Sequence, residues 1–397
     1  MSFGEEPFDV GAVLLAGAGA LCLAGFVLYL WNSRGERSEL ALAGRTAILA
    51  FPPDLKATDP AHKLLLSATP RTSAGRVRLG QLETTGSLRI GTVDLSGPKA
   101  PVAPEPATAA TQGPVSVRHN LWLEGADEGW QLQVTDANEA LVGRLALARQ
   151  GTAPASPTMV ASLVPEDIAV GRLVIRWGEY LAVTDVQFIN PSGRRPEENR
   201  TANETINRRH DEDTSALSRV RLLAQRNETA MVLPKGPRLS ISFQRTLARG
   251  ERAEGNRTSR GLRVDGPDFA RLTTTPTGSV VMLAESPVPR LRTERALRFG
   301  KTVIATGNQV VGFPGSYGLW LKRVGSGWRL VFNNEPDAWG SQHDPKFDAA
   351  EVDLSYSDGH AAARPFAVAL MPGGADRGRL AIMWGPHEWT ADFAVAN

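Results

Sequence analysis

The sequence of 397 residues predicts a mainly β protein: two duplicated antiparallel β-sandwich-like or barrel-like modules, one N-terminal transmembrane helix and one connector helix. Three observations support this fold class. Short motifs recur after about two hundred residues, which indicates two similar modules. Short apolar and polar alternations are broken by frequent Gly and Pro residues, as in antiparallel sheets. One long uncharged segment lies near the N-terminus, as expected for a helix in a membrane.

Residues 10–31 form that uncharged segment, which is 22 residues long and follows a short tail, residues 1–9. As a helix it is long enough to cross roughly 30 Å of hydrocarbon, and Tyr29 and Trp31 stand at its end, where amphipathic rings favour the interface. A cleavable signal peptide is the alternative, but the tail has no Lys or Arg and no clear cleavage site follows. We therefore expect an uncleaved single-pass anchor that contacts lipid in a bacterial inner membrane.

Three regions follow the anchor: a first β-module over residues 42–190, a charged connector over 191–235 and a second β-module over 236–397. The first module contains a Pro- and Ala-rich run, residues 96–117, whose composition is typical of an exposed loop. In the connector, apolar residues of 213–226 share one helical face, and acidic residues stand at the start of this segment. This pattern predicts one amphipathic helix.

The two copies are aligned through three pairs of motifs. These are Leu-Trp-Leu at 121–123 and 319–321, Gly-Arg-Leu at 171–173 and 378–380, and a glycine pattern at 80–91 and 300–312. The offsets between them are 198 (121 to 319), 207 (171 to 378) and 221 (91 to 312) residues. The alignment therefore predicts about 23 extra residues in the first copy, within its Pro- and Ala-rich run, and about nine in the second copy, near residues 339–347.

Six tryptophans occupy matching strand positions in the two copies. They are Trp122, Trp130, Trp177, Trp320, Trp328 and Trp384. Burial of one such ring removes roughly 150–250 Å² from water, so we expect these rings to fill the cores of the two modules. The alternative is that some of them stay exposed and stack on a ligand.

Composition and motifs exclude several functions. The net charge of +2 is too small for a broad nucleic-acid surface, so no nucleic-acid partner is expected. The single cysteine, Cys22, lies within the uncharged segment, so the remaining chain has no disulfide and no thiolate metal site. The nucleophile elbow, phosphate loop and His-Glu-x-x-His motifs do not occur. We assign no catalytic residue, no metal and no cofactor.

The best candidate for a ligand site is the segment that contains Trp339, His343 and Asp344, in the part special to the second copy. An aromatic ring, an imidazole and a carboxylate on one loop can hold a polar ligand. His387 and Glu388 could join them if the strands bring the two segments together. Two His and two carboxylates could also hold a metal ion, although the spacing fits no known motif. The simpler interpretation is that His343 and Asp344 form hydrogen-bonded turns.

The second copy also resembles a bacterial family of uncharacterised β-rich domains. The motifs that carry this resemblance are Gly315-Ser316-Tyr317-Gly318-Leu319, Gly327-Trp328 followed by Asn333, Trp339-Gly340 and the C-terminal Trp384-Gly385. The resemblance covers about residues 300–397 and implies a β-sandwich that is usually exported, but no reaction. Its export favours an extracytoplasmic location, whereas the arginines that follow the anchor (Arg34, Arg37, Arg45) favour the cytoplasm.

Together these features favour a membrane-anchored, non-enzymatic accessory or scaffolding protein that holds protein partners, such as subunits of an integral-membrane complex. Two alternatives stay open. One is a ligand-binding or hydrolytic β-domain with its site at Trp339, His343 and Asp344. The other is a carbohydrate-binding module, which requires exposed aromatic rings.

Overall fold

The computed structural model describes most of the two predicted modules. The described residues are 36–42, 44–52, 55–66, 76–97, 116–126, 129–149, 156–167, 169–189, 226–233, 237–244, 263–281, 288–306, 316–336, 343–359, 364–374 and 376–396. The predicted tail 1–9, the predicted anchor 10–31 and residues 213–225 of the predicted connector helix lie outside them. Within the described ranges, no helix combines the length and the apolar character needed to cross a membrane.

The protein is mainly β, as predicted. The elements of its first half are β1 (Glu36–Leu42), β2 (Arg45–Phe51), α2 (Pro60–Leu66), β3 (Val77–Thr84), β4 (Leu88–Ile90), β5 (Val93–Leu95), β6 (Val117–Ala126), β7 (Gly129–Thr135), β8 (Leu141–Arg149), β9 (Ser156–Pro165), β10 (Val170–Gly178) and β11 (Tyr180–Phe188). Those of its second half are β12 (Arg226–Val232), β13 (Arg238–Gln244), α5 (Pro267–Thr274), β14 (Val280–Val281), β15 (Arg290–Thr293), β16 (Leu297–Phe299), β17 (Thr302–Ile304), β18 (Ser316–Val324), β19 (Gly327–Asn333), η5 (Pro345–Phe347), β20 (Asp348–Ser357), β21 (Ala367–Pro372), β22 (Arg377–Trp384) and β23 (His387–Val395).

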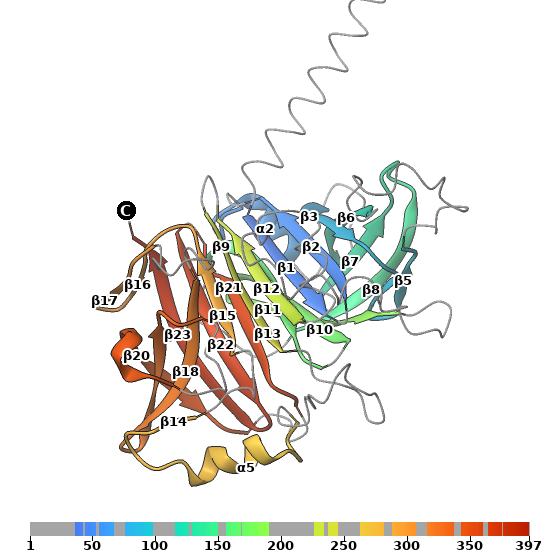
Figure 1. Ribbon diagram of the computed structural model, residues 1–397. Helices are drawn as coiled ribbons and strands as arrows, with labels where there is room; N and C mark the ends of the chain where they lie inside the picture. The colour runs from blue at the N-terminus through green and yellow to red at the C-terminus, as the bar shows by residue number, and fades with distance from the viewer. Residues whose placement is uncertain are drawn as a thin grey trace, which may run out of the picture.

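One antiparallel sheet runs through both halves. Its strand order is β8-β7-β6-β3-β2-β1-β12-β13-β15-β18-β19-β20. Two smaller antiparallel sheets pack against it, β9-β10-β11-β4-β5 in the first half and β21-β22-β23-β16-β17 in the second. The last residues of β8 and β20 leave the large sheet and pair with β11 and β23. Each half is therefore a folded-over, sandwich-like body (Figure 1).

The ladders of the second half repeat those of the first in order and in register. The β7–β8 ladder is irregular between Val134 and Thr135, and the β19–β20 ladder is irregular between Phe332 and Asn333, 198 residues later (134 to 332). The β4–β5 hairpin pairs Leu88 with Leu95, and the β16–β17 hairpin pairs residues 297 and 304 in the same way. The two halves therefore share these features of their ladders.

The register corrects one part of the sequence alignment. The hairpin glycine Gly91 has φ 53° and its counterpart is Gly300 with φ 56°, which is an offset of 209 residues (91 to 300) and not 221. The offset then falls to 198 at β6 and β18, so the first half has about eleven extra residues before β6, not 23. The sequence alignment pairs Gly91 with Gly312 because a similar pattern of Gly and Thr follows Gly300. The hairpin that corresponds to Gly91 is the preceding one, at Gly300. The nine-residue difference of the second half lies between β19 and β20.

The two halves meet at their first strands, β1 and β12, which pair antiparallel (Figure 1). Ser38 lies opposite Met231, and Leu40 lies opposite Thr229. Ser38 of β1 and Thr229 of β12 occupy equivalent positions in the two halves, and so do Leu40 and Met231. Ser38 therefore pairs with the equivalent of Leu40, and Leu40 pairs with the equivalent of Ser38, as expected for two like strands related by an approximate two-fold axis. Residues 226–232 were expected in the connector but form β12. Their polar composition resembles an exposed segment, yet Glu228 is buried beside Arg238 in the neighbouring strand.

The same hydrogen bond ties the smaller sheets to this junction on both sides of the axis. The backbone N–H of Leu163 in β9 donates to Ser38 Oγ at 2.8 Å. The N–H of Leu370 in β21 donates to Thr229 Oγ1 at 3.3 Å. Val164 of β9 belongs to the hydrophobic core of the second half. The two halves are therefore packed together below the large sheet as well as joined within it.

Four of the six tryptophans are fully buried, namely Trp130, Trp177, Trp320 and Trp384. The other two, Trp122 and Trp328, are only half-buried, which corrects the expectation that all six are core residues. Strand alternation explains Trp122, because Leu121 and Leu123 on either side point into the core and the indole must point outward. Trp389, which the repeat did not single out, is fully buried.

Candidate functional site

The predicted site residue Trp339 lies outside the described residues, whereas His343 and Asp344 lie directly before η5. His343 Nε2 is 2.7 Å from Asp348 Oδ1, and its ring meets the edge of Trp320 at 5.4 Å between centroids. Asn333 Nδ2 donates to the same Asp348 oxygen at 2.9 Å. His343 thus covers the outward-facing indole of Trp320. These contacts give His343 a structural role.

Asp344 does not pair with His343 as a catalytic dyad would. Its side chain caps η5 by accepting from the backbone N–H of Lys346 at 3.1 Å, and it forms an ion pair with Lys346 Nζ at 2.6 Å. These hydrogen bonds hold the pKa of Asp344 below its usual value. The carboxylate that His343 does contact is Asp348, which the sequence analysis did not single out.

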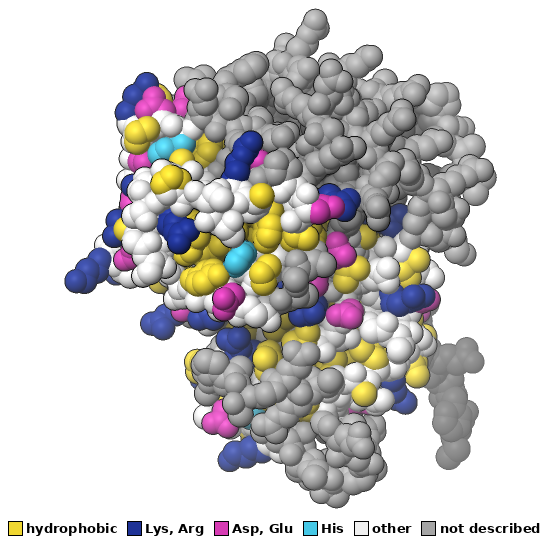
Figure 2. Space-filling view, turned by 90° about the horizontal axis from the view of Figure 1, so that it is seen from below, with side chains coloured by type: hydrophobic (Ala, Val, Ile, Leu, Met, Phe, Trp, Pro, Cys, Tyr) yellow, Lys and Arg dark blue, Asp and Glu magenta, His cyan; other side chains and the backbone are white. Residues whose placement is uncertain are grey.

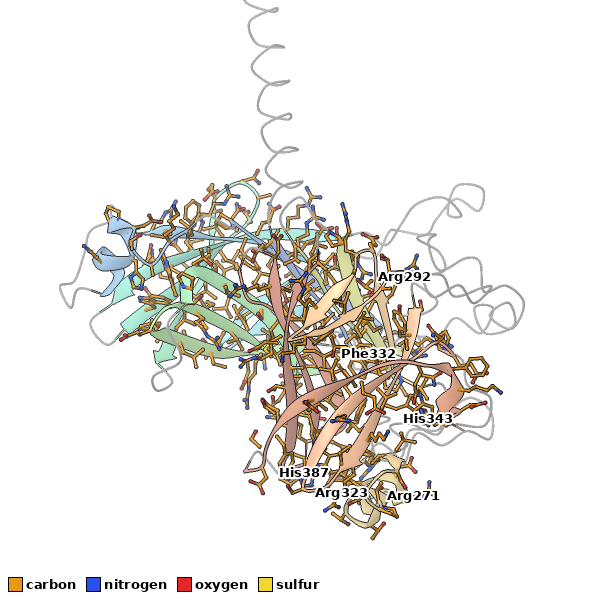
Figure 3. All side chains as sticks on the ribbon, turned by 90° about the vertical axis from the view of Figure 1, so that its left-hand side faces the viewer. Arg271, Arg292, Arg323, Phe332, His343 and His387 are labelled. Carbon is orange, nitrogen blue, oxygen red and sulfur yellow. The ribbon has the colours of Figure 1, made fainter. Side chains whose placement is uncertain are left out.

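His387 and Glu388 lie at a different end of the second half. His343 contacts Asp348 at the start of β20, whereas His387 Nδ1 is 2.8 Å from Tyr356 Oη near the end of that strand. Eight residues of strand separate these contact points, a distance of about 26 Å. Figure 3 shows the two labelled histidines in separate places. The predicted residues therefore do not form one site, and no group of three metal-ligating side chains occurs among the described residues.

A row of aromatic rings surrounds His387 instead. In order of contact, the row is Trp328 (β19), Trp389 (β23), Tyr356 (β20), His387 (β23) and Phe269 (α5). Successive centroids are 5.5, 5.9, 5.9 and 5.8 Å apart, so each ring packs directly on the next. We call this set the aromatic row. It was missed because its members come from four elements, although His387-x-Trp389 has the two-residue spacing that places both on one face of a strand.

The aromatic row is partly open to solvent. Tyr356 is 42% exposed, Trp328, His387 and Phe269 are half-buried, and only Trp389 is fully covered. Figure 2 shows hydrophobic side chains exposed among polar ones on the lower face of the molecule. Burial lowers the pKa of His387, with an opposing effect from Asp358, and burial and Asp358 both raise the pKa of Tyr356. Both side chains are therefore neutral at pH 7 and their hydrogen bond is between uncharged groups.

The turn between β22 and β23 positions the row. Gly385 in that turn has φ 57°, a conformation that favours glycine. A Cβ at Gly385 would lie 2.9 Å from the ring of Phe269. Phe269 also packs edge-on against Trp384 at 5.5 Å, which connects the row to the core.

Arg323 lies 5.8 Å from the ring of Trp328. Figure 3 shows Arg323, Arg271 and His387 toward the same end of the second half.

The corresponding rings of the first half are buried and not exposed to solvent. The counterparts of Trp328 and His387 are Trp130 and Tyr180, which are both buried and stack at 3.7 Å. The counterpart of Phe269 is His62, which is also buried and lies 3.0 Å from the carbonyl oxygen of Trp177 through Nε2. The same fold thus covers its rings in one half and leaves them open in the other.

Two buried groups of charged residues link the halves. Arg238 of β13 donates to Glu39 of β1 at 2.9 Å and also contacts Glu228 of β12, and the two carboxylates are only 7% and 6% exposed. Burial alone would lower the pKa of Arg238, but the charges of Glu228 and Glu39 outweigh it and raise that pKa. Arg364, which is 6% exposed, donates to Glu166 in the turn before β10 at 2.9 Å.

Searches for related proteins found no match for the chain among protein-family models, curated proteins or solved structures.

Proposed function

We propose that this protein is a non-enzymatic binding protein, tethered to a bacterial inner membrane by residues 10–31, whose two duplicated β-modules act as one rigid platform for protein partners. The observation that carries the proposal is the junction between the halves. A continuous β1–β12 ladder and buried ion pairs at Arg238 and Arg364 support a fixed arrangement of the modules. Such a body presents surfaces of both halves to one partner without reorganisation, which lowers the cost of binding.

The candidate site residues support a binding protein better than an enzyme. His343 and Asp344 hold their loop in place, and His387 packs between aromatic rings. The hydrolytic alternative at Trp339, His343 and Asp344 therefore receives no support from the contacts of the two described residues. The resemblance to exported β-rich domains favours a platform on the outer side of the membrane, whereas Arg37 and its neighbouring arginines favour the inner side.

The proposal is tested by purifying the full chain in mild detergent after crosslinking in cells. We expect a defined complex with a fixed ratio of this chain to a partner, and reporter fusions to the C-terminus establish the side of the membrane. The Arg364→Met variant, which loosens the junction, should reduce the yield of the complex, whereas Arg329→Met on the exposed face should not. A chain that washes from membranes in salt and behaves as a free monomer would refute the proposal.

A further inference from the structure

We propose that the aromatic row is a carbohydrate-binding site, which takes the apolar faces of the sugar rings of a β-linked oligosaccharide. The inference does not depend on the membrane tether or on a protein partner. The proposal assigns a ligand class to Trp328, Tyr356, His387 and Phe269, which are all partly exposed.

The comparison between the halves carries the first step. The first half shows that this fold can bury its corresponding rings, since Trp130, Tyr180 and His62 are all covered. The second half places Tyr356 at the position of Arg149 and leaves its ring 42% exposed. Exposed aromatic surface costs free energy that burial would recover, so an opened set of rings indicates a surface that something else covers.

The rings are also held in place before any ligand arrives. The hydrogen bond from Tyr356 Oη to His387 Nδ1, at 2.8 Å, ties β20 to β23. The planes of Tyr356 and His387 are 30° apart, and those of His387 and Phe269 are also 30° apart, so the three rings have similar orientations. Rigid aromatic side chains lose little entropy on binding, which suits a shallow site.

The charges around the row select the ligand class. Arg323 flanks Trp328, and Asp358 is close enough to influence both Tyr356 and His387. A border with both signs of charge complements a neutral ligand whose edge carries many hydroxyl groups, which donate and accept hydrogen bonds. A β-linked pyranose has such an edge around a flat face of C–H groups, and these groups pack on the electron-rich face of an aromatic ring. An anionic lipid surface would instead favour a border of Lys and Arg without a carboxylate.

The test is isothermal titration of the full chain, purified in detergent, with cellohexaose and chitohexaose. Maltohexaose, whose α-linkages curve the chain, and decaproline, which tests a proline-rich peptide as occupant, are the comparison probes. We expect weak binding of at least one β-linked hexasaccharide, with a Kd of about 1 mM or below. Tyr356→Ala should weaken that binding about tenfold, the effect of losing one ring contact.

Two variants keep the result interpretable. Tyr356→Phe retains the ring and should bind within about threefold of the wild type, which separates stacking from folding. Trp122→Ala removes the half-buried indole of the first half and should leave binding unchanged. Absence of binding to both β-linked hexasaccharides overturns the proposal, as does equal binding by the wild type and Tyr356→Ala. Binding of decaproline alone assigns the row to a peptide and also overturns it.

Discussion

Replacing Arg238 by Met tests whether the junction between the halves depends on buried charge. The guanidinium of Arg238 is shared by Glu39 and Glu228, which are 7% and 6% exposed. Met has a similar length but leaves both carboxylates without this cation in a poorly solvated place. Breaking a buried ion pair from one side costs about 3–5 kcal/mol. We expect the free energy of unfolding to fall by that amount in urea titrations of the full chain at pH 7.5.

The matched control is Arg329→Met, because Arg329 also bridges two carboxylates but on an exposed surface. It contacts Glu351 at 3.1 Å and Asp353 at 2.8 Å, and Asp353 is 86% exposed. An exposed pair contributes about 1 kcal/mol or less, so this variant should lose little stability. Adding Glu39→Gln and Glu228→Gln to Arg238→Met should restore most of the loss, since no buried charge then lacks its cation.

The pH dependence of the Arg238→Met variant gives a second measurement. In the variant, burial and mutual repulsion disfavour two charged carboxylates in this place, and protonation relieves both effects. The cost of the substitution is therefore smaller at low pH, where protonation is easier. The variant should therefore be closer to the wild type at about pH 5 than at pH 7.5. A loss below about 1 kcal/mol at pH 7.5, equal to that of Arg329→Met, would refute the reasoning.

Three further predictions concern the second half. Gly385→Ala should destabilise the protein by about 1 kcal/mol more than Gly300→Ala in urea titrations. Both glycines have φ near 57°, but only a Cβ at Gly385 would meet Phe269. Equal losses of stability would contradict the packing of Phe269 against Gly385. His343→Ala should lower the stability by about 1–2 kcal/mol, seen as a lower Tm, whereas an unchanged Tm would remove its structural role. Burial lowers the pKa of His387, so the unfolded chain binds the imidazole proton more readily than the folded chain does. The free energy of unfolding should therefore fall as the pH drops below about 6.5. His387→Phe should reduce this fall, and an unchanged pH profile of stability in that variant would contradict the prediction.

Strand alternation made most of the fold predictable. The β-rich class follows from short alternating runs and from glycines at hairpin turns such as Gly91, where a positive φ is required. The strand β12 could not be predicted in the same way. Its charged residues are typical of an exposed connector, and only the pairing of Glu228 with Arg238, which lies in the next strand, makes their burial affordable.

The candidate site could be predicted only in part. His343 and Asp344 stand out in the sequence because they share one loop with Trp339, and His387 and Glu388 because they follow the Trp384-Gly385 motif. The sequence could not show that β20 separates them, because that distance depends on which strands pair. Tyr356 was missed because a single tyrosine near the end of a polar strand has no local signal, and its role arises from contact with His387.

The sequence by itself determined the class of fold and the rings that the protein has available, because side-chain alternation and turn residues act over a few neighbouring positions. Only the tertiary structure decided which rings are covered and which stay open. Trp130 and Trp328 occupy the same strand position, yet one is fully buried and the other is only half-buried. The difference comes from residues on other strands, because long-range pairing brings Tyr180 against Trp130 in one half and Trp389 against Trp328 in the other.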